Sequence, residues 1–312
     1  MLTLSKYIIL AITTICGQNL FSQNKDVNLV ELTNEFDTEI EISGMVGHNN
    51  TLYLVSEREE IVFLLNKRDY SLIKSIDLTK AIINFNSKNT ENEINIRGIE
   101  MEGITWYNNN LYFVDEGNTS IYKYQLKERT ISRLTTNLDL STFTGSLGME
   151  GIAVNPNKKL IYILRERNGN NQSEIYTLNI SNDLFLSYDS ARYIINHPNK
   201  NWRYSDIYYD SEENMIYGLR SYYERKVPEA AKCFIDKIPV NANGTINKPV
   251  EFSKDESLSE EVIKNRCMYV SNLEGLYKAH GKILIVSDNA RGTKECNSKP
   301  VKTMFVEYLI QE

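Results

Sequence analysis

Met101-Glu102-Gly103-Ile104 is the stretch that decides the fold, because the chain repeats it. Two further close copies are Met149-Glu150-Gly151-Ile152 and Leu273-Glu274-Gly275-Leu276. After a polar turn, each copy is followed by an apolar run that ends in an acid. These runs are Leu111-Tyr112-Phe113-Val114-Asp115-Glu116, Ile161-Tyr162-Ile163-Leu164-Arg165-Glu166 and Ile283-Leu284-Ile285-Val286-Ser287-Asp288.

Two looser copies complete a set of five. Ser43-Gly44-Met45 leads to a run that ends at Glu57, and Ser205-Asp206-Ile207 leads to one that ends at Ser221. The glycine positions are residues 44, 103, 151, 206 and 275, so successive copies are 59, 48, 55 and 69 residues apart. Self-similarity at a period of about 50 residues is typical of a propeller or an array.

Each unit contains four stretches that alternate between apolar and polar residues, which indicates β-strands. In the second unit they are Gly103 to Tyr107, Leu111 to Val114, Ile121 to Leu126 and Thr130 to Leu134. Four antiparallel strands repeated radially make the blades of a propeller. The sequence therefore predicts an all-β, five-bladed β-propeller of four-stranded antiparallel blades.

The fifth unit is short, because the chain ends soon after its third strand, Met304 to Ile310. We expect Val27 to Leu32 to supply the missing outer strand, which closes the ring and covers an open edge. The long gap before Gly275 leaves a six-bladed alternative open. We interpret it instead as a helical excursion, Ser253 to Lys264, and expect a second helix at Asp77 to Phe85.

The N-terminus has the pattern of a secretory signal, with Lys6 before a short apolar core from Tyr7 to Ile15. We predict a signal peptide at residues 1–23, a single propeller domain at residues 24–312, and a secreted or periplasmic protein. The apolar core is too short to span a bilayer. A lipid anchor on Cys16 is the alternative, which the bulky Ile15 disfavours.

The 312 residues carry a formal charge of −6, which argues against a nucleic-acid partner. We expect a monomer with no membrane span.

Without the signal, three cysteines remain. We favour one disulfide between Cys267 and Cys296, with Cys233 as a free thiol. The alternative is that all three cysteines are unpaired thiols.

Strands one and two of a blade are antiparallel, so the repeated phrase and the acid after strand two lie on one face of the ring. Glu102, Glu150 and Glu274 should converge near the axis, where crowded carboxylates need a proton or a cation. Oxygen ligands without His or Cys suit calcium. The predicted metal ligands are Glu102, Glu150, Asp206 and Glu274. The predicted second acidic tier is Glu57, Glu116, Glu166 and Asp288. Alternatively, Glu-Gly-Ile is only a folding device.

Arginines on the same face could bind an anion through paired hydrogen bonds. The candidates are Arg165, Arg220 and Arg291, although salt bridges to neighbouring acids remain the alternative role. No nucleophile elbow is present. The three histidines are His48 and His280, both in turns on the opposite face, and His197, which has no obvious acidic partner. A Ser-His-Asp triad is therefore disfavoured.

At these residues the sequence resembles the phytase-like propeller family, also named for the esterase-like activity of phytase. Glu150 to Arg167 and Asn272 to Asn289 carry most of the resemblance. The pattern is also similar to SdiA-regulated propellers and, more distantly, to calcium-activated nucleotidases. These relatives imply a cation on the axis, but no catalytic residue carries over. Ser43 and Ser205 depart from the pattern, because no carboxylate stands there.

Two functions follow as expectations. The first is an exported, calcium-binding hydrolase of phosphate or carboxylate esters that takes a small anionic substrate. The second is a non-catalytic propeller that binds a ligand or a protein and has a structural calcium ion. Fold alone does not decide between them.

Overall fold

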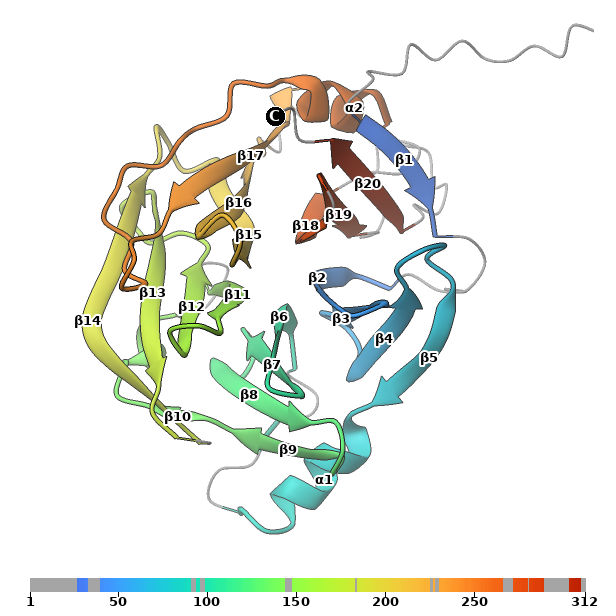
Figure 1. The fold of residues 1–312 in the computed structure, drawn as a ribbon, viewed down its shortest axis with the longest axis vertical. Helices are drawn as coiled ribbons and strands as arrows, with labels where there is room; N and C mark the ends of the chain where they lie inside the picture. Colours follow the sequence, from blue (N-terminus) through green and yellow to red (C-terminus); the bar gives the residue numbers. More distant parts are fainter. Residues whose placement is uncertain are drawn as a thin grey trace, which may run out of the picture.

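The computed structural model describes residues 27–32, 40–90, 94–95, 99–143, 148–182, 184–224, 227, 230–265, 272–279, 281–288 and 303–309. These residues form five β-sheets around a common centre (Figure 1). The innermost strands β2, β6, β11, β15 and β18 contact one another in this order, and β18 contacts β2. The predicted five-bladed β-propeller is confirmed.

Blades 1 to 3 follow the expected meander of four antiparallel strands. Blade 1 consists of β2 (Ile42–His48), β3 (Thr51–Ser56), β4 (Ile61–Asn66) and β5 (Leu72–Asp77). Blade 2 consists of β6 (Met101–Tyr107), β7 (Asn110–Asp115), β8 (Ser120–Gln125) and β9 (Thr130–Arg133). Blade 3 consists of β11 (Met149–Asn155), β12 (Leu160–Arg165), β13 (Gln172–Ile180) and β14 (Phe185–Asn196), with the short β10 (Thr135–Thr136) parallel to β14.

Blade 5 is closed by the N-terminal part of the chain, as the sequence predicted. Its strands are β18 (Asn272–Ala279), β19 (Lys282–Asp288), β20 (Met304–Leu309) and β1 (Val27–Glu31). The antiparallel pairing runs from Val27 opposite Tyr308 to Glu31 opposite Met304. The first and last described strands therefore lie side by side in one sheet, which covers the open edge of β20.

Blade 4 is the least regular blade and has three named strands, β15 (Trp202–Asp210), β16 (Met215–Tyr222) and β17 (Lys232–Pro239). An isolated bridge from Lys237 to Glu251 extends its outer edge.

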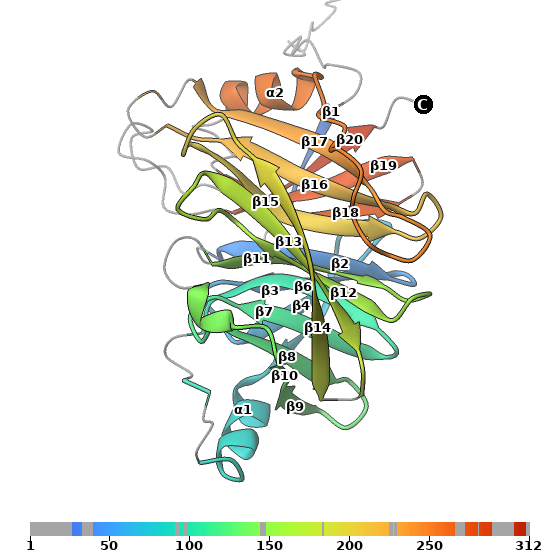
Figure 2. The ribbon, with the colours of Figure 1, turned by 90° about the vertical axis from the view of Figure 1, so that its left-hand side faces the viewer.

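The chain then forms α2 (Ser257–Asn265), which packs on β17, while α1 (Thr79–Asn86) packs on β9. Both helices lie on the rim, on opposite sides of the ring (Figures 1 and 2). The predicted helical excursion, Ser253 to Lys264, thus contains α2, and the described residues between β17 and β18 form no sixth blade. No helix among the described residues is long and apolar enough to cross a membrane.

The apolar run in strand two is continuous because each blade is covered on both faces. In β7, Leu111 and Phe113 pack toward blade 1 in one core cluster, together with Val55. Tyr112 and Val114 point to the other face and pack toward blade 3 in a second cluster. Alternating side chains of one strand therefore join two different cores, and both faces must be apolar.

Each innermost strand has a β-bulge at the repeated phrase. In blade 2, Met101 pairs with Asp115 and Gly103 with Val114, so Glu102 has no partner. The same shift occurs in the other four blades. The residues at the bulge are Ser43, Glu102, Glu150, Ser205 and Glu274. A bulge redirects a side chain, and here it brings one residue from each blade to the same end of the ring.

The glycine that follows the bulge lets neighbouring blades touch through their backbones. A Cβ atom on Gly44 would lie 2.8 Å from the carbonyl oxygen of Glu102. One on Gly103 would lie 2.9 Å from both the Glu150 carbonyl oxygen and the Gly151 Cα. A Cβ on Gly275 would meet Met45 N at 2.8 Å, so the contact also crosses the closing seam. Only glycine permits this approach without a backbone shift.

We expect Gly103→Ala to lower the free energy of unfolding by about 1–3 kcal/mol, because its Cβ meets rigid backbone atoms. Gly169→Ala is the matched control, since nothing lies within 4 Å of its Cβ position. Denaturant titration of both variants measures the difference. Equal stabilities would show that the inner ring tolerates a side chain here.

Candidate functional site

The acidic side chains at the bulges form the centre of the candidate site. Glu102 and Glu274 are buried, and Glu150 is partly buried. All three occupy the bulge of an innermost strand, in blades 2, 3 and 5, so their side chains lie at the same end of the ring. The structure therefore brings together the three inner glutamates that the sequence predicted to converge.

The serines at the other two bulges bind the neighbouring backbone. Ser205 Oγ donates to the carbonyl oxygen of Leu273 in the next blade at 2.9 Å. Ser43 Oγ donates to the carbonyl oxygen of Met101 in the same way. Both serines are buried. At these two positions the bulge joins adjacent blades and contributes no charge.

The second acidic tier is held by a backbone hydrogen bond that recurs in three blades. In each, the N–H of the acid after strand two donates to the carbonyl of the residue two positions before the bulge. The bonds run from Glu57 to Glu41 (2.9 Å), from Glu116 to Glu100 (2.9 Å) and from Glu166 to Gly148 (3.0 Å). The backbone therefore fixes both tiers at the same end of the blades.

The carboxylates are close enough to alter one another's protonation. Burial, followed by the charges of Glu150, Glu57 and Glu274, raises the pKa of Glu102 well above its ordinary value. Burial and the charge of Glu166 do the same to the pKa of Glu150. The two tiers thus form one electrostatic unit, which we name the acidic cluster: Glu57, Glu102, Glu116, Glu150, Glu166 and Glu274.

Glu116 lies between the inner ring and the next blade. Its carboxylate accepts a hydrogen bond from Gly148 N at 2.9 Å. Burial is the main cause that raises the pKa of Glu116 to about 7, and the charges of Glu166 and Glu100 raise it further. The hydrogen bond from Gly148 N and the charge of Arg203 act in the opposite direction and lower the pKa. A Cβ on Gly148 would lie 2.2 Å from Oε1 of Glu116, so a larger residue here would displace the carboxylate.

Arg203 is a member of the site that sequence reasoning missed. Its guanidinium contacts Glu166 at 2.6 Å and Glu274 at 3.4 Å, and Nε donates to Ser221 Oγ at 3.3 Å. Burial alone would lower the pKa of Arg203, but the carboxylates of Glu274, Glu166 and Glu150 outweigh it and raise the pKa. The signal was present in the repeat: Arg203 lies two residues before the bulge at Ser205, where blade 3 has Gly148.

Asp206, one of the four predicted metal ligands, binds backbone groups in this structure. Its Oδ2 accepts Leu276 N of the next blade at 2.7 Å, and its Oδ1 accepts Ile207 N at 2.7 Å. Burial raises the pKa of Asp206 well above its ordinary value, although these two hydrogen bonds act to lower it. Asp206 occupies the glycine position of blade 4, where its carboxylate joins blades 4 and 5.

Two of the three predicted anion-binding arginines are paired within the fold. Arg165 contacts Glu174 at 3.1 Å and the Thr142 carbonyl at 2.7 Å. Arg220 contacts the fully buried Asp236 at 2.6 Å. Its guanidinium also lies over three aromatic rings, those of Trp202, Phe234 and Phe252. The alternative role, a salt bridge, is thus observed for both arginines.

Several predicted features lie outside the described residues. Arg291, His280, Cys267 and Cys296 are among them, as is the signal segment at residues 1–23. Asp288 ends β19, but its side chain is not described. The remaining cysteine, Cys233, is a buried free thiol.

The two described histidines contact other side chains, and His197 is linked to the acidic cluster because its partner Ser173 also donates to the carbonyl oxygen of Glu166. His48 ends β2, at the opposite end from the bulge, and stacks on Trp106 with ring centroids 4.0 Å apart. His197 Nε2 lies 2.7 Å from Oγ of the buried Ser173. Burial, then the charges of Arg220 and Arg167, lowers the pKa of His197 to about 4. Both histidines therefore have structural partners.

The donor set of the acidic cluster consists of oxygen atoms, which suits a hard cation such as calcium. As placed in the described residues, no three His, Cys, Asp or Glu side chains form a ready-made metal site. Binding a cation would therefore require some of the carboxylates to turn toward one another.

The fold and the site together define a five-bladed propeller with an acidic centre. The chain belongs to the phytase-like family described as "Esterase-like activity of phytase", whose model matches residues 41–290. None of the curated proteins compared matches the chain.

Three solved structures show the level of structural similarity. A luciferin-regenerating enzyme is 12% identical, with 86% of this chain and 77% of that chain covered and a TM-score of 0.43. Virginiamycin B lyase from Staphylococcus aureus is 10% identical, with 91% and 99% covered and a TM-score of 0.42. The PQQ-bound aldose sugar dehydrogenase from Streptomyces coelicolor is 9% identical, with 90% and 98% covered and a TM-score of 0.42. Similarity at this level carries no argument about function.

The raised pKa of Glu116 predicts a pH-dependent stability. Between its ordinary pKa of 4.5 and about 7, Glu116 holds a proton in the folded chain but not in the unfolded chain. The folded state then binds more protons, so the free energy of unfolding falls as pH rises through this window. With a chelator present, we expect the melting temperature to fall by a few degrees between about pH 5 and about pH 7.5.

Glu116→Gln should reduce this slope, because glutamine does not titrate. Glu128→Gln, at an exposed position, is the control and should keep it. Thermal melting across the pH range measures both variants. A slope that Glu116→Gln leaves unchanged would contradict the assignment of the raised pKa to this carboxyl.

Proposed function

We propose that the protein is an exported, calcium-dependent hydrolase of phosphate or carboxylate esters that acts at the acidic cluster. The observation that carries the proposal is the convergence of six carboxylates, three of them at the bulges of blades 2, 3 and 5, with Arg203 beside them. Membership of a family described by an esterase-like activity supports the reaction class. The signal pattern at residues 1–23 supports export.

The electrostatics of the cluster favour a divalent cation. Buried carboxylates that face one another must be protonated or share a cation, and Glu102 and Glu150 have strongly raised pKa values without one. We assign the metal-facing role to Glu102, Glu150 and Glu274. Asp206, the fourth ligand predicted from the sequence, accepts the N–H groups of Leu276 and Ile207. When bound, the ion would polarise an ester oxygen or activate a water molecule.

Arg203 supports binding of an anionic substrate next to the metal. The side chain is 27% exposed, so the guanidinium is within reach of a ligand as well as of Glu166 and Glu274. A guanidinium matches the geometry of phosphate and carboxylate. We therefore assign the anion-binding role to Arg203 in place of Arg165 and Arg220, whose side chains are less exposed, at 15% and 12%. Arg291 remains a candidate from the sequence.

A second candidate function is a non-catalytic binding module with a structural calcium ion. It is favoured by the contacts of the described histidines, because His48 stacks on Trp106 and His197 binds the buried Ser173. In this candidate the ion relieves the repulsion between the carboxylates. The same face then binds an anionic ligand or a protein partner without chemical change.

Calcium is expected to stabilise the protein in either candidate function. A ligand at a hundred times its Kd stabilises by about 2.7 kcal/mol, so millimolar calcium should raise the melting temperature by several degrees. In Glu102→Gln with Glu150→Gln the rise should disappear, whereas Glu128→Gln should keep it. The absence of any shift in the unmodified protein would remove calcium from both functions.

Hydrolysis separates the two functions. We expect activity on an aryl phosphate or an aryl acetate that a chelator abolishes. The double variant Glu102→Gln with Glu150→Gln should lose about a hundredfold or more in kcat/KM. Arg203→Lys should raise KM, because lysine keeps the charge but not the paired geometry.

Activity that survives both chelation and the double variant would place the reaction elsewhere. Calcium binding without activity on aryl esters, nucleotides or phytate would support the binding module instead.

A further inference from the structure

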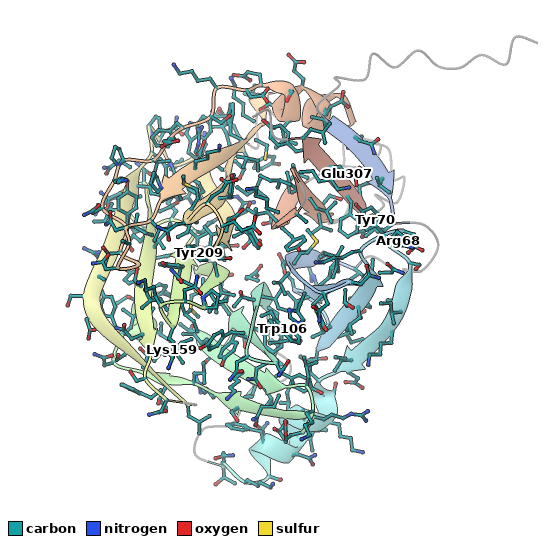
Figure 3. The ribbon with its side chains drawn as sticks, viewed as in Figure 1. Arg68, Tyr70, Trp106, Lys159, Tyr209 and Glu307 are labelled. Carbon is teal, nitrogen blue, oxygen red and sulfur yellow. The ribbon has the colours of Figure 1, made fainter. Side chains whose placement is uncertain are left out.

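A separate pocket lies at the other end of the blades, on the seam between blades 5 and 1. Its walls come from the turns that join β2 to β3 and β4 to β5, and from Ala279 and Lys282 at the ends of β18 and β19. The pocket therefore lies at the end of the blades opposite to the bulges. Figure 3 shows Arg68, Tyr70 and Glu307 together at this seam. The cavity volume is about 290 Å³, near the lower end of the range for small-molecule sites, which begins at about 300 Å³.

The lining of this pocket includes an apolar and aromatic surface. Leu52 and Leu284 are buried and belong to the core cluster beneath it. The Tyr277 ring lies against the backbone of Gly47, where a Cβ would approach the ring to 2.3 Å. On the other side, Tyr70 packs edge-on against Phe305 with centroids 4.8 Å apart. Two tyrosines with fixed rings therefore form the walls.

The charged residues that line the pocket are all cationic: Lys67, Arg68 and Lys282. Lys282 binds Glu307, which lies behind the pocket and also accepts the hydroxyl of Tyr70. Lys67 Nζ instead contacts a neutral group, the Tyr277 hydroxyl, at 2.7 Å. Burial lowers the pKa of Lys67 and shows that its ammonium has lost part of its hydration. The pocket therefore has positive charge in excess.

We propose that this pocket binds a small organic anion, in which a carboxylate, sulfonate or phosphate group is attached to an apolar or aromatic body. The body would lie between Tyr70 and Tyr277. The anionic group would lie at Lys67 and Arg68, and ammonium and guanidinium donors form charge-assisted hydrogen bonds with such groups. Aromatic walls and a few convergent polar groups are the usual features of a small-molecule site.

The proposed site is distinct from the acidic cluster in position and in charge. Its residues belong to turns at one end of the blades, whereas the bulges lie at the other end. A ligand here would contact blade 1 and blade 5, the blade that the N-terminal strand β1 completes. Bound ligand should therefore stabilise the closed ring.

Calorimetric titration with naphthalenesulfonate tests the site, because this probe combines an aromatic body with a single anionic group. We expect one molecule to bind per chain and to raise the melting temperature. Lys67→Gln and Arg68→Gln should each weaken binding by about tenfold, the loss of one charge-assisted contact. Arg68 is exposed, so its variant should fold normally. Lys127→Gln, at an exposed position in another blade, should bind like the unmodified protein.

Two further measurements separate this site from the proposed function. Naphthalenesulfonamide has the same body without the charge and should bind at least about tenfold more weakly. Glu102→Gln with Glu150→Gln should leave probe binding unchanged, even if calcium binding or hydrolysis fails. The proposal is overturned if the probe does not bind, if the sulfonamide binds equally well, or if Lys67→Gln and Arg68→Gln have no effect. Loss of binding in the double variant would place the probe at the acidic cluster instead.

Discussion

Close contact between the backbones of neighbouring innermost strands is the constraint on which the rest of the structure depends. At Gly44, Gly103 and Gly275 a Cβ atom would lie within 3 Å of the next blade's backbone. This contact sets how near the blades come to the centre, and the bulge before each glycine redirects one side chain there. The repeated Glu-Gly phrase is therefore both a folding device and a way of gathering carboxylates. These two interpretations of the phrase are not alternatives, because one geometry produces both.

Burial affects the acids at the centre differently, according to the partners that the backbone provides. Asp206 receives an N–H from its own strand and another from the next blade, which compensate part of its desolvation. Glu102 lies beside like charges, and its pKa is raised by both burial and repulsion. Arg203 forms ion pairs with Glu166 and Glu274, and its charge also offsets part of the repulsion at Glu150 and Glu116. Its charge is not among the main influences on Glu102, so a cation near Glu102 would be most stabilising.

The fold was predictable because its signals are local and repeated. The phrase, the apolar run after it and the N-terminal strand that pairs with β20 are all visible in the sequence. The roles of individual polar residues were not, because they depend on neighbours in other blades. Arg220 looked like an anion ligand until Asp236 and the rings around it were in place. Arg203 was overlooked because its two acidic partners come from blades 3 and 5.

The two ends of the blades are under different constraints, and this explains why their charges differ. At the bulge end, the close backbone contact recurs at Gly44, Gly103 and Gly275, so similar residues recur around the ring. In blade 4 the Asp206 carboxylate makes the connection to the next blade instead. At the other end, turns make no contact of that kind and each can vary independently. A cationic pocket can therefore form at a single seam, from turns of blades 1 and 5 alone. Because the apolar cores between blades separate the two ends, a change of charge at one should act on the other only through screened, long-range electrostatics.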